Sequence, residues 1–415
     1  MAQPSVTNKT VCIVGLGYVG HPLAEAFSHR IRTLGFDIDE KKIQSLQKTP
    51  SAIVASSDPA RIREADFVMI CVPTLLTPEN DPDLSYVCSA ATTVGANLKK
   101  GCVVILESTV YPGVTEDVLL PILEKESGLL SGRDFKVGYS PERINPGDSE
   151  HVLSRTTKIV AGMDGETTDR MAELYSLITK VYCAPDIRTA EAAKVVENIQ
   201  RDVNIALINE LSQMFHKLGL STRDVLEAAS TKWNFHQYTP GIVGGHCIPT
   251  VPYFLAYAAK REGYAPRMIL TTRAINDDMI PFISGLVTSN LKSAGKKIPG
   301  ARIAVLGLTY KENVPDYRDN PVLDLITVLR DQQVEVFGYD PLMTDEEIAR
   351  IGVTPLADIG QQMDGYILAA PHDQFMGMVK KEFAAVSGPG ILFIDIKGAF
   401  YKDASMRQMF NYLTL

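Results

Sequence analysis

The chain has 415 residues, and its 41 Lys and Arg against 49 Asp and Glu give a formal net charge of −8. A hydrophobic fraction of 45% excludes a disordered chain and provides core for about two or three domains. The mild acidic excess argues against nucleic acid or an anionic membrane surface as a partner, and no apolar run is long enough to span a membrane. Residues 1–10 lack the features of a signal peptide, so we expect a cytosolic protein with neither disulfides nor a metal site.

The N-terminal segment alternates strand-like and helix-like stretches, with the first helix predicted at 22–30. Its predicted strands are 11–14, 33–36, 67–72, 102–106 and 158–161. Because buried apolar strands alternate with helices, we expect a parallel sheet that is covered on both faces. Cys12, Cys71 and Cys102 lie in these apolar runs, where we expect small buried side chains.

A glycine-rich turn, Gly15-Leu-Gly-Tyr-Val-Gly20, follows the first strand and opens the first helix. Its glycines permit a tight turn and let a pyrophosphate approach the helix N-terminus closely. Asp37 ends the next strand, where a carboxylate can bind the adenosine ribose hydroxyls and would repel a 2′-phosphate. The arrangement predicts NAD binding, the alternative being a turn that serves only helix–sheet packing.

Two further turns, Val72-Pro-Thr74 and Ser108-Thr-Val-Tyr-Pro-Gly113, follow later strands of the same predicted sheet. Each by itself is more often an ordinary loop. Because open parallel sheets present ligands beyond the carboxyl ends of their strands, we expect both turns to line one site.

The pattern then changes to helical spacing. Apolar residues three and four apart predict one amphipathic helix that runs from Thr189, as its N-cap, to Leu218 and ends at Gly219. Ser221 and Asp224 resemble a capping pair for the next helix. We expect the long helix to join two α/β segments and to form the surface of a homodimer.

Lys194 and Asn198 stand at positions i and i+4 of this helix, so their side chains leave the same face. One interpretation is a solvated helix surface. The other is a cleft in which a lysine and an amide polarise an oxygen or orient a water.

A glycine-rich loop is predicted at Pro240–Pro249, in which Gly241, Gly244 and Gly245 free the backbone to wrap a ligand. Cys247 follows these glycines and is expected to lie in the loop. A loop thiolate beside a nicotinamide can trap an aldehyde as a hemithioacetal, which a second oxidation turns into a thioester. From the residues alone, a structural role for Cys247 weighs as much as a catalytic one, and His246 is interpreted as a loop residue.

The strand–helix alternation resumes after the turn-rich stretch 294–300. Further strands are predicted at 302–306, 334–337, 365–368 and 391–394. We therefore predict an α/β fold of two Rossmann-like doubly wound domains, joined by a long central helix and a helical middle domain. The expected domains are 1–188 for NAD binding, 189–299 for the helical part and 300–415, which lacks GxGxxG and so holds its ligand differently.

In this order the motifs resemble those of the UDP-glucose/GDP-mannose dehydrogenase family of NAD-dependent nucleotide-sugar 6-dehydrogenases, over almost the whole chain. The matching segments are GLGYVG at 15–20, STVYPG at 108–113, SPERINPGD at 140–148, Glu191 with Lys194 and Asn198, PGIVGGHCIP at 240–249 and GLTYKENVPDYRDNP at 307–321. SPERINPGD and Lys232-Trp-Asn-Phe235 are most similar to UDP-N-acetylhexosamine 6-dehydrogenases, which make uronates for surface polysaccharides.

The resemblance implies a four-electron oxidation in which Cys247 is the nucleophile that captures the C6 aldehyde, before a second oxidation and hydrolysis release the uronate. Lys194 is expected to stabilise the oxyanions, with Asn198 as its hydrogen-bonding partner. Glu142 is expected to act as general acid or base or to orient water, and Thr109 to hold a water near the nicotinamide.

The resemblance also assigns the residues that bind the two ligands. The expected NAD site comprises Gly15, Gly17, Tyr18, Val19, Gly20, Asp37, Lys42, Thr74, Thr109 and Arg318. The expected UDP-sugar site comprises Glu142, Arg143, Ile144, Lys194, Asn198, Tyr238, Gly241, Gly244, Gly245, Lys311 and, with a weaker match, Lys397.

Val251 departs from the family pattern, which has an aspartate four residues after the nucleophile. Three readings stay open: Glu142, Lys194 and Thr109 suffice for thioester hydrolysis, hydrolysis is slow, or the protein has another substrate or impaired activity. Residues 236–239 also differ from the pattern, so the sugar is not identified. The alternatives are a UDP-glucose 6-dehydrogenase, a two-electron β-hydroxyacid-type dehydrogenase, and a catalytically impaired protein that binds nucleotide sugars.

Overall fold

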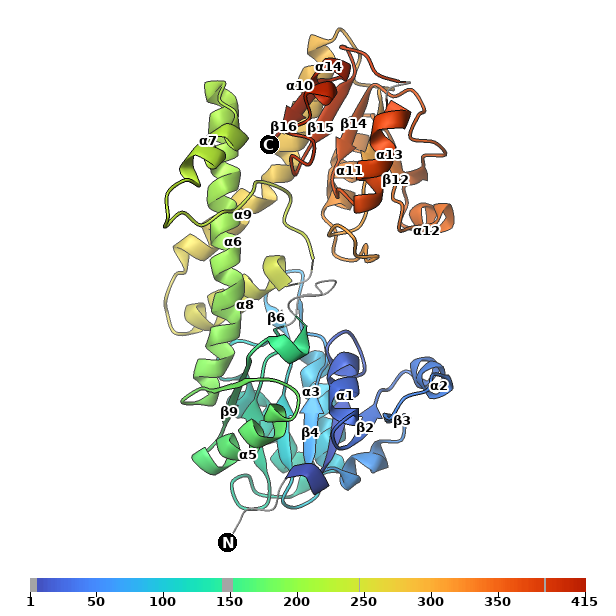
Figure 1. Cartoon of the computed structure of the whole chain (residues 1–415). Coiled ribbons are helices and arrows are strands. Elements are labelled where there is room, and N and C mark those ends of the chain that lie inside the picture. The colour runs from blue at the N-terminus through green and yellow to red at the C-terminus, as the bar shows by residue number, and fades with distance from the viewer. Residues whose placement is uncertain (1–5, 144–151, 246, 384–385) are drawn as a thin grey trace. The chain divides into compact units, whose positions relative to one another are not determined.

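The computed structural model describes residues 6–143, 152–245, 247–383 and 386–415 (Figure 1). By its internal contacts the chain forms two compact units. The N-terminal unit is Met1–Asn198 with Thr250–Pro266, and the C-terminal unit is Ile199–Pro249 with Arg267–Leu415. Among the helices of the described residues, none is both long and apolar enough to cross a membrane.

The N-terminal unit is built on an eight-stranded sheet in the order β10-β9-β8-β7-β4-β1-β2-β3. These strands are β1 Thr10–Val14, β2 Arg32–Phe36, β3 Val54–Ser56, β4 Phe67–Ile70, β7 Val103–Leu106, β8 Lys136–Tyr139, β9 Lys158–Gly162 and β10 Val181–Cys183. Its helices are α1 Gly20–Ser28, α2 Glu40–Lys48, α3 Ser85–Ala96, α4 Leu120–Ser127 and α5 Gly165–Ser176. A hairpin of β5 Leu75–Leu76 and β6 Pro82–Asp83 stands apart from the sheet.

Two apolar layers cover the faces of this sheet. Alternate β1 side chains enter them, Val11 and Ile13 packing with Phe27 of α1 and Cys12 and Val14 with Val87 of α3. Cys12, Cys71 and Cys102 are buried, as predicted. The layered arrangement confirms the expected α/β class.

The expected all-parallel topology is wrong for two strands of the sheet, because β9 is reversed and β10 pairs parallel with it. β9 runs antiparallel to β8, with Gly138 opposite Gly162 and Tyr139 opposite Ala161. A parallel return needs a crossover connection, which is usually an α-helix. The described residues between these strands form only the short 3₁₀ turn Leu153–Arg155. Because of the reversal, the first residue of β9 lies at the edge where the parallel strands end.

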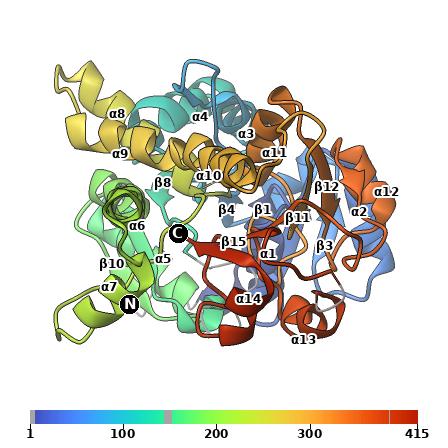
Figure 2. The same ribbon diagram turned by 90° about the horizontal axis from the view of Figure 1, so that it is seen from above.

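The C-terminal unit contains a six-stranded parallel sheet in the order β13-β12-β11-β14-β15-β16. The strands are β11 Arg302–Leu306, β12 Glu335–Tyr339, β13 Thr354–Pro355, β14 Gly365–Leu368, β15 Leu392–Asp395 and β16 Asn411–Thr414. The helices are α7 Thr222–Ala229, α9 Arg267–Asp277, α10 Met279–Ser293, α11 Val322–Asp331, α12 Asp345–Arg350, α13 Asp373–Glu382 and α14 Ala404–Met409. Helices α10 and α11 cover one face of the sheet, and α13 and α14 cover the other (Figure 2). Their apolar side chains belong to two separate buried clusters.

The predicted long helix is α6, Ile187–Leu218, which begins three residues earlier than expected from Thr189 as N-cap. Its N-terminus is capped by Asp186, whose Oδ1 accepts from the backbone N–H of Thr189 at 2.7 Å, so Thr189 lies in the first turn. Gly219 ends the helix at φ +70, as predicted. Ser221 caps α7 by accepting from the N–H of Asp224, also as predicted.

Candidate active site

The turn after β1 leaves its backbone open at one position. Gly15 has φ +92, and a Cβ there would lie 2.6 Å from the carbonyl oxygen of Cys71. A Cβ on Gly20 would lie 1.8 Å from the carbonyl oxygen of Gly15, whereas a Cβ on Gly17 would meet no atom within 4 Å. Two glycines are therefore required by packing, and the third leaves free the surface that a pyrophosphate approaches. The turn fits a dinucleotide.

Asp37 is buried directly after β2 and is bound to this turn. Its Oδ2 accepts from the Leu16 N–H at 2.9 Å and from Lys42 Nζ at 2.8 Å, and its Oδ1 accepts from the Asp39 N–H. Burial acts to raise the pKa of Asp37, but the bonds from Lys42, Asp39 and Leu16 outweigh it and lower the pKa. The carboxylate is therefore ionised at neutral pH, which suits it to bind ribose hydroxyls.

Asp37→Ala is expected to weaken NAD binding by roughly 10- to 100-fold, because two hydrogen bonds to a charged acceptor would be lost. NAD titration by calorimetry measures the change, and the affinity for UDP should stay within twofold. Asp39→Ala is the matched control, since Asp39 is exposed and caps α2 through the N–H groups of Lys41 and Lys42. Unchanged NAD affinity in Asp37→Ala, with a loss in Asp39→Ala, would move the ribose contact to Asp39.

The turns that follow β4 and β7 are bonded to each other. The Ser108 hydroxyl donates to the carbonyl of Val72 at 2.6 Å and accepts from the Val72 N–H at 3.1 Å. The Thr74 hydroxyl donates to the carbonyl of Thr109 at 2.7 Å. This confirms that both turns meet at the carboxyl edge of the sheet.

Glu191 of α6 holds the second of these turns in place. Its carboxylate is fully buried and accepts from the N–H of Gly113 at 2.5 Å and from the N–H and hydroxyl of Thr115 at 2.9 and 2.7 Å. Burial raises the pKa of Glu191 to about 7, against the opposing effect of these donors. Lys194, one helical turn after Glu191, is half-buried, and Asn198, two turns after it, is buried. This burial favours the cleft over the solvated surface for this face.

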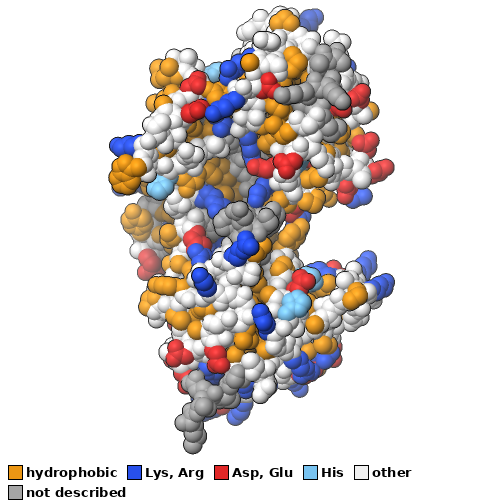
Figure 3. All heavy atoms as spheres, in the orientation of Figure 1, with side chains coloured by type: hydrophobic (Ala, Val, Ile, Leu, Met, Phe, Trp, Pro, Cys, Tyr) orange, Lys and Arg blue, Asp and Glu red, His pale blue; other side chains and the backbone are white. Residues whose placement is uncertain are grey.

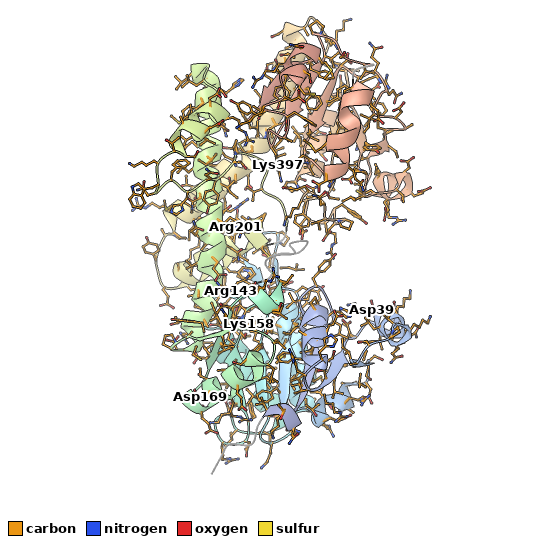
Figure 4. All side chains as sticks on the ribbon, in the orientation of Figure 1. Asp39, Arg143, Lys158, Asp169, Arg201 and Lys397 are labelled. Carbon is orange, nitrogen blue, oxygen red and sulfur yellow. The ribbon has the colours of Figure 1, made fainter. Side chains whose placement is uncertain are left out.

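Glu142 lies just beyond β8 and is 8% exposed. Its Oε1 accepts from the N–H of Arg143 at 2.6 Å, and its Oε2 lies 3.3 Å from Nζ of the fully buried Lys158. Arg143 in turn donates to the carbonyl of Thr157 at 2.6 Å and pairs with Glu197 of α6 at 2.7 Å. Figure 4 shows Arg143 and Lys158 near each other at this end of the unit.

Sequence reasoning did not identify two residues next to Glu142, which are Lys158 and Glu107. Lys158 also pairs with Glu107 at 2.6 Å, and Glu107 accepts a short hydrogen bond from the hydroxyl of Tyr175. Charged residues are rarely buried unless they are paired. The available signal was therefore a charged residue directly next to a buried apolar run, Glu107 after β7 and Lys158 at the start of β9. Ile144, expected in the substrate site, lies outside the described residues.

In the C-terminal unit, the glycine-rich loop is anchored to α6. Asn209 is fully buried, accepts from the Gly241 N–H at 2.8 Å and donates to the Gly241 carbonyl at 3.0 Å. A Cβ on Gly244 would lie 2.9 Å from Pro321, and Gly245, at φ +81, donates to the carbonyl of Asp319 at 2.9 Å. The loop therefore packs directly on the 307–321 motif, as required if both contact one ligand.

Two of the expected cations of this unit, Lys397 and Arg318, have carboxylate partners. Lys397 Nζ lies 2.6 Å from Glu312, and Arg318, expected near NAD, pairs with Asp316 at 2.8 Å. The carbonyl of Lys311 accepts from the Thr309 hydroxyl, which orders its loop.

A cavity of about 20 Å³ is lined by Gly244, Thr309, Tyr310, Asn320, Pro321 and Lys397 among others. Tyr238, also expected at the substrate, accepts from Gln200 at 3.0 Å.

The prediction that Cys247 lies in a loop is wrong. Cys247 is the first residue of α8, Cys247–Arg261, and it is exposed. The prolines of this segment indicated a loop. Pro249, however, falls in the first helical turn, where a missing N–H leaves no hydrogen bond unmade. His246 lies outside the described residues.

The first turn of the second doubly wound sheet repeats that of the first. Gly307 has φ +84, and the Leu308 N–H donates at 2.6 Å to Asp340, which follows β12 as Asp37 follows β2. Here, however, the side chain of the acid is fully buried, whereas that of Asp37 is 8% exposed, and its carboxylate lies 3.0 Å from Nε2 of the fully buried His372. Asp340 is therefore less accessible to a ribose than Asp37.

Comparison with known proteins matches all three domain patterns of one family. The patterns of the UDP-glucose/GDP-mannose dehydrogenase family match residues 9–57 and 53–179 (NAD binding domain), 188–278 (central domain) and 304–402 (UDP binding domain). The chain is 41% identical over 413 residues to Protein CapL of Staphylococcus aureus, covering 95% of this chain and 97% of that protein. It is 39% identical over 414 residues to a UDP-N-acetyl-D-glucosamine 6-dehydrogenase of Pseudomonas aeruginosa, covering 95% and 98%. The solved structure of a UDP-D-ManNAc dehydrogenase from Pyrococcus horikoshii is similar, with TM-score 0.84, 29% identity and 98% of each chain covered.

Proposed function

The chain belongs to the UDP-glucose/GDP-mannose dehydrogenase family, and from this premise we propose that it oxidises the C6 hydroxyl of a UDP-N-acetylhexosamine to the uronate. It is an NAD-dependent oxidoreductase with the three-domain fold of that family, as expected. The domain boundaries at 188 and 299 stay predictions, as does the cytosolic location. The product would supply the synthesis of surface polysaccharides.

The observation that carries the proposal is the combination of the open turn at Gly17, the ionised Asp37 and an exposed Cys247 that opens α8. A simple two-electron dehydrogenase needs no such cysteine. NAD, when bound on the turn and Asp37, accepts one hydride in each of two oxidations. The net reaction converts one alcohol, two NAD⁺ and one water into one carboxylate, two NADH and three protons.

The residues of the chain divide this work. The Cys247 thiolate adds to the aldehyde carbon, and the resulting C–S bond breaks when water attacks the thioester. Lys194 stabilises the negative charge that develops on the C6 oxygen, with Asn198 as its partner. Glu142 takes the proton of the attacking water.

Counting NADH per sugar tests the function. We would offer UDP-glucose and the UDP derivatives of N-acetylglucosamine, N-acetylgalactosamine and N-acetylmannosamine, and expect two NADH per molecule of one N-acetylated sugar. One NADH per sugar would establish the two-electron alternative. Two NADH from UDP-glucose alone would identify a UDP-glucose 6-dehydrogenase, and binding of NAD and a UDP-sugar without turnover would identify an impaired protein.

An exposed apolar stripe on α6 supports the proposed homodimer. Leu207, Met214 and Leu218 are 52, 49 and 66% exposed and fall on one helix face. Figure 3 shows hydrophobic side chains interspersed with charged ones on the left of the view, the side on which Figure 1 draws α6. Leu207→Glu should convert a dimer into monomers in multi-angle light scattering, because a buried unpaired charge destabilises an interface. Leu130→Glu, at a 50% exposed position of the N-terminal unit, should stay dimeric. A monomeric wild-type chain would refute the dimer.

A further inference from the structure

A buried cation lies beneath the proposed base. Lys158 is 1% exposed, and its Nζ lies 2.6 Å from Glu107 and 3.3 Å from Glu142. Glu107 directly follows β7 and Glu142 lies just beyond β8, whereas Lys158 is the first residue of β9. Only because β9 is antiparallel to β8 does its first residue reach the carboxyl edge of the other two strands. The reversed strand thus delivers a positive charge to the site.

The titratable groups around Lys158 keep it charged. They are Glu107, Glu142, Cys71 and Tyr175, whose ring centre lies 5.7 Å from Nζ. Burial acts to lower the pKa of Lys158, but the two carboxylates outweigh it and raise the pKa. Burial, with the neighbouring Glu142, raises the pKa of Glu107 to about 7 despite Lys158. One ammonium group therefore stabilises the charge of two carboxylates. A change in one carboxylate alters the electrostatic stabilisation of the other.

We propose that Lys158 and Glu107 are positioning residues that set the orientation and charge of Glu142. Lys158 holds one carboxylate oxygen of Glu142, and the N–H of Arg143 holds the other, so the side chain is fixed from both ends. Glu107 lies closer to the same ammonium group than Glu142 does. It therefore limits how much Lys158 stabilises the ionised form of Glu142. Stability alone is a weak reason for this arrangement, since apolar replacements of buried ion pairs are often neutral. The role in catalysis rests on the function proposed for Glu142.

Two substitutions are expected to move the titration of Glu142 in opposite directions. Lys158→Met removes the cation and should raise the midpoint by about one pH unit or more, whereas Glu107→Gln frees the cation and should lower it. Side-chain carboxyl NMR of protein labelled with ¹³C-glutamate, assigned with Glu142→Gln, measures the midpoint without any substrate. Lys158→Arg should retain the wild-type value. Lys136→Met is the matched control, because it breaks a 2.6 Å pair with Asp164 at the start of β8, the opposite edge of the sheet.

Activity then separates this inference from the proposed function. The pH profile of uronate release in single turnover should shift with the midpoint in each variant, upward for Lys158→Met and downward for Glu107→Gln. Glutamine has the shape of glutamate and can form hydrogen bonds in its place. Glu107→Gln therefore still tests the proposal if Lys158→Met does not fold. Midpoints that match the wild type in every folded variant would overturn the proposal. Shifted midpoints in a protein that releases no uronate would support the positioning while refuting the function proposed for the site.

Discussion

Cys247→Ser is expected to lower uronate formation by roughly 10³-fold or more, because the variant lacks the proposed nucleophile of thioester formation. Cys247 is exposed at the first position of α8, where a substrate can reach its sulfur. A serine hydroxyl at this place is not ionised at neutral pH. NADH formation should stop at no more than one per sugar, and mass spectrometry of the products should show no uronate.

Cys183→Ser provides the matched control for this variant. Cys183 is also exposed and ends β10 in the N-terminal unit, so its loss tests the effect of removing a surface thiol. Its uronate yield should equal that of the wild type. Uronate formation at the wild-type rate in Cys247→Ser would reject the nucleophile, even if NAD and a UDP-sugar were bound normally.

The first nucleotide-binding turn was predictable because its signals are local. The glycines at 15 and 20 are demanded by contacts within the first strand–turn–helix unit and with Cys71. Asp37 lies at the end of the neighbouring strand, so its position follows from parallel pairing of β1 and β2. The same logic located the turns after β4 and β7, which meet because their strands are adjacent.

The remaining features depend on pairings that the local pattern does not encode. The apolar run at 158–161 indicates a strand but not its direction, so the meeting of Lys158 with Glu107 and Glu142 could not be derived. Pro249 after Cys247 indicated a loop, although the first helical turn accepts a proline. His372 meets Asp340 only because β14 pairs with β11, which the helix pattern alone does not specify.

Val251→Asp is expected to lower the free energy of unfolding by about 1–3 kcal/mol, because it buries a carboxylate at a position that is 3% exposed. Burial should raise the pKa of the new carboxyl group, so the loss is fully present at neutral pH and shrinks at low pH, where the group is protonated. Urea denaturation at both pH values measures this. Asparagine has the shape of aspartate without its charge. Val251→Asn should therefore lose less free energy of unfolding at neutral pH, and its loss should not depend on pH.

The same variant decides which carboxylate serves hydrolysis. Residue 251 lies one helical turn after Cys247, so an aspartate there would leave α8 on the face of the nucleophile. We expect no faster release of uronate in single turnover, because Glu142, fixed by Lys158 and the N–H of Arg143, already supplies a carboxylate. Release that is tenfold faster in Val251→Asp but not in Val251→Asn would show that the missing aspartate limits turnover. Glu142 would then act as an acid or as a substrate contact, and its fixed geometry would serve binding of the sugar instead of activation of water.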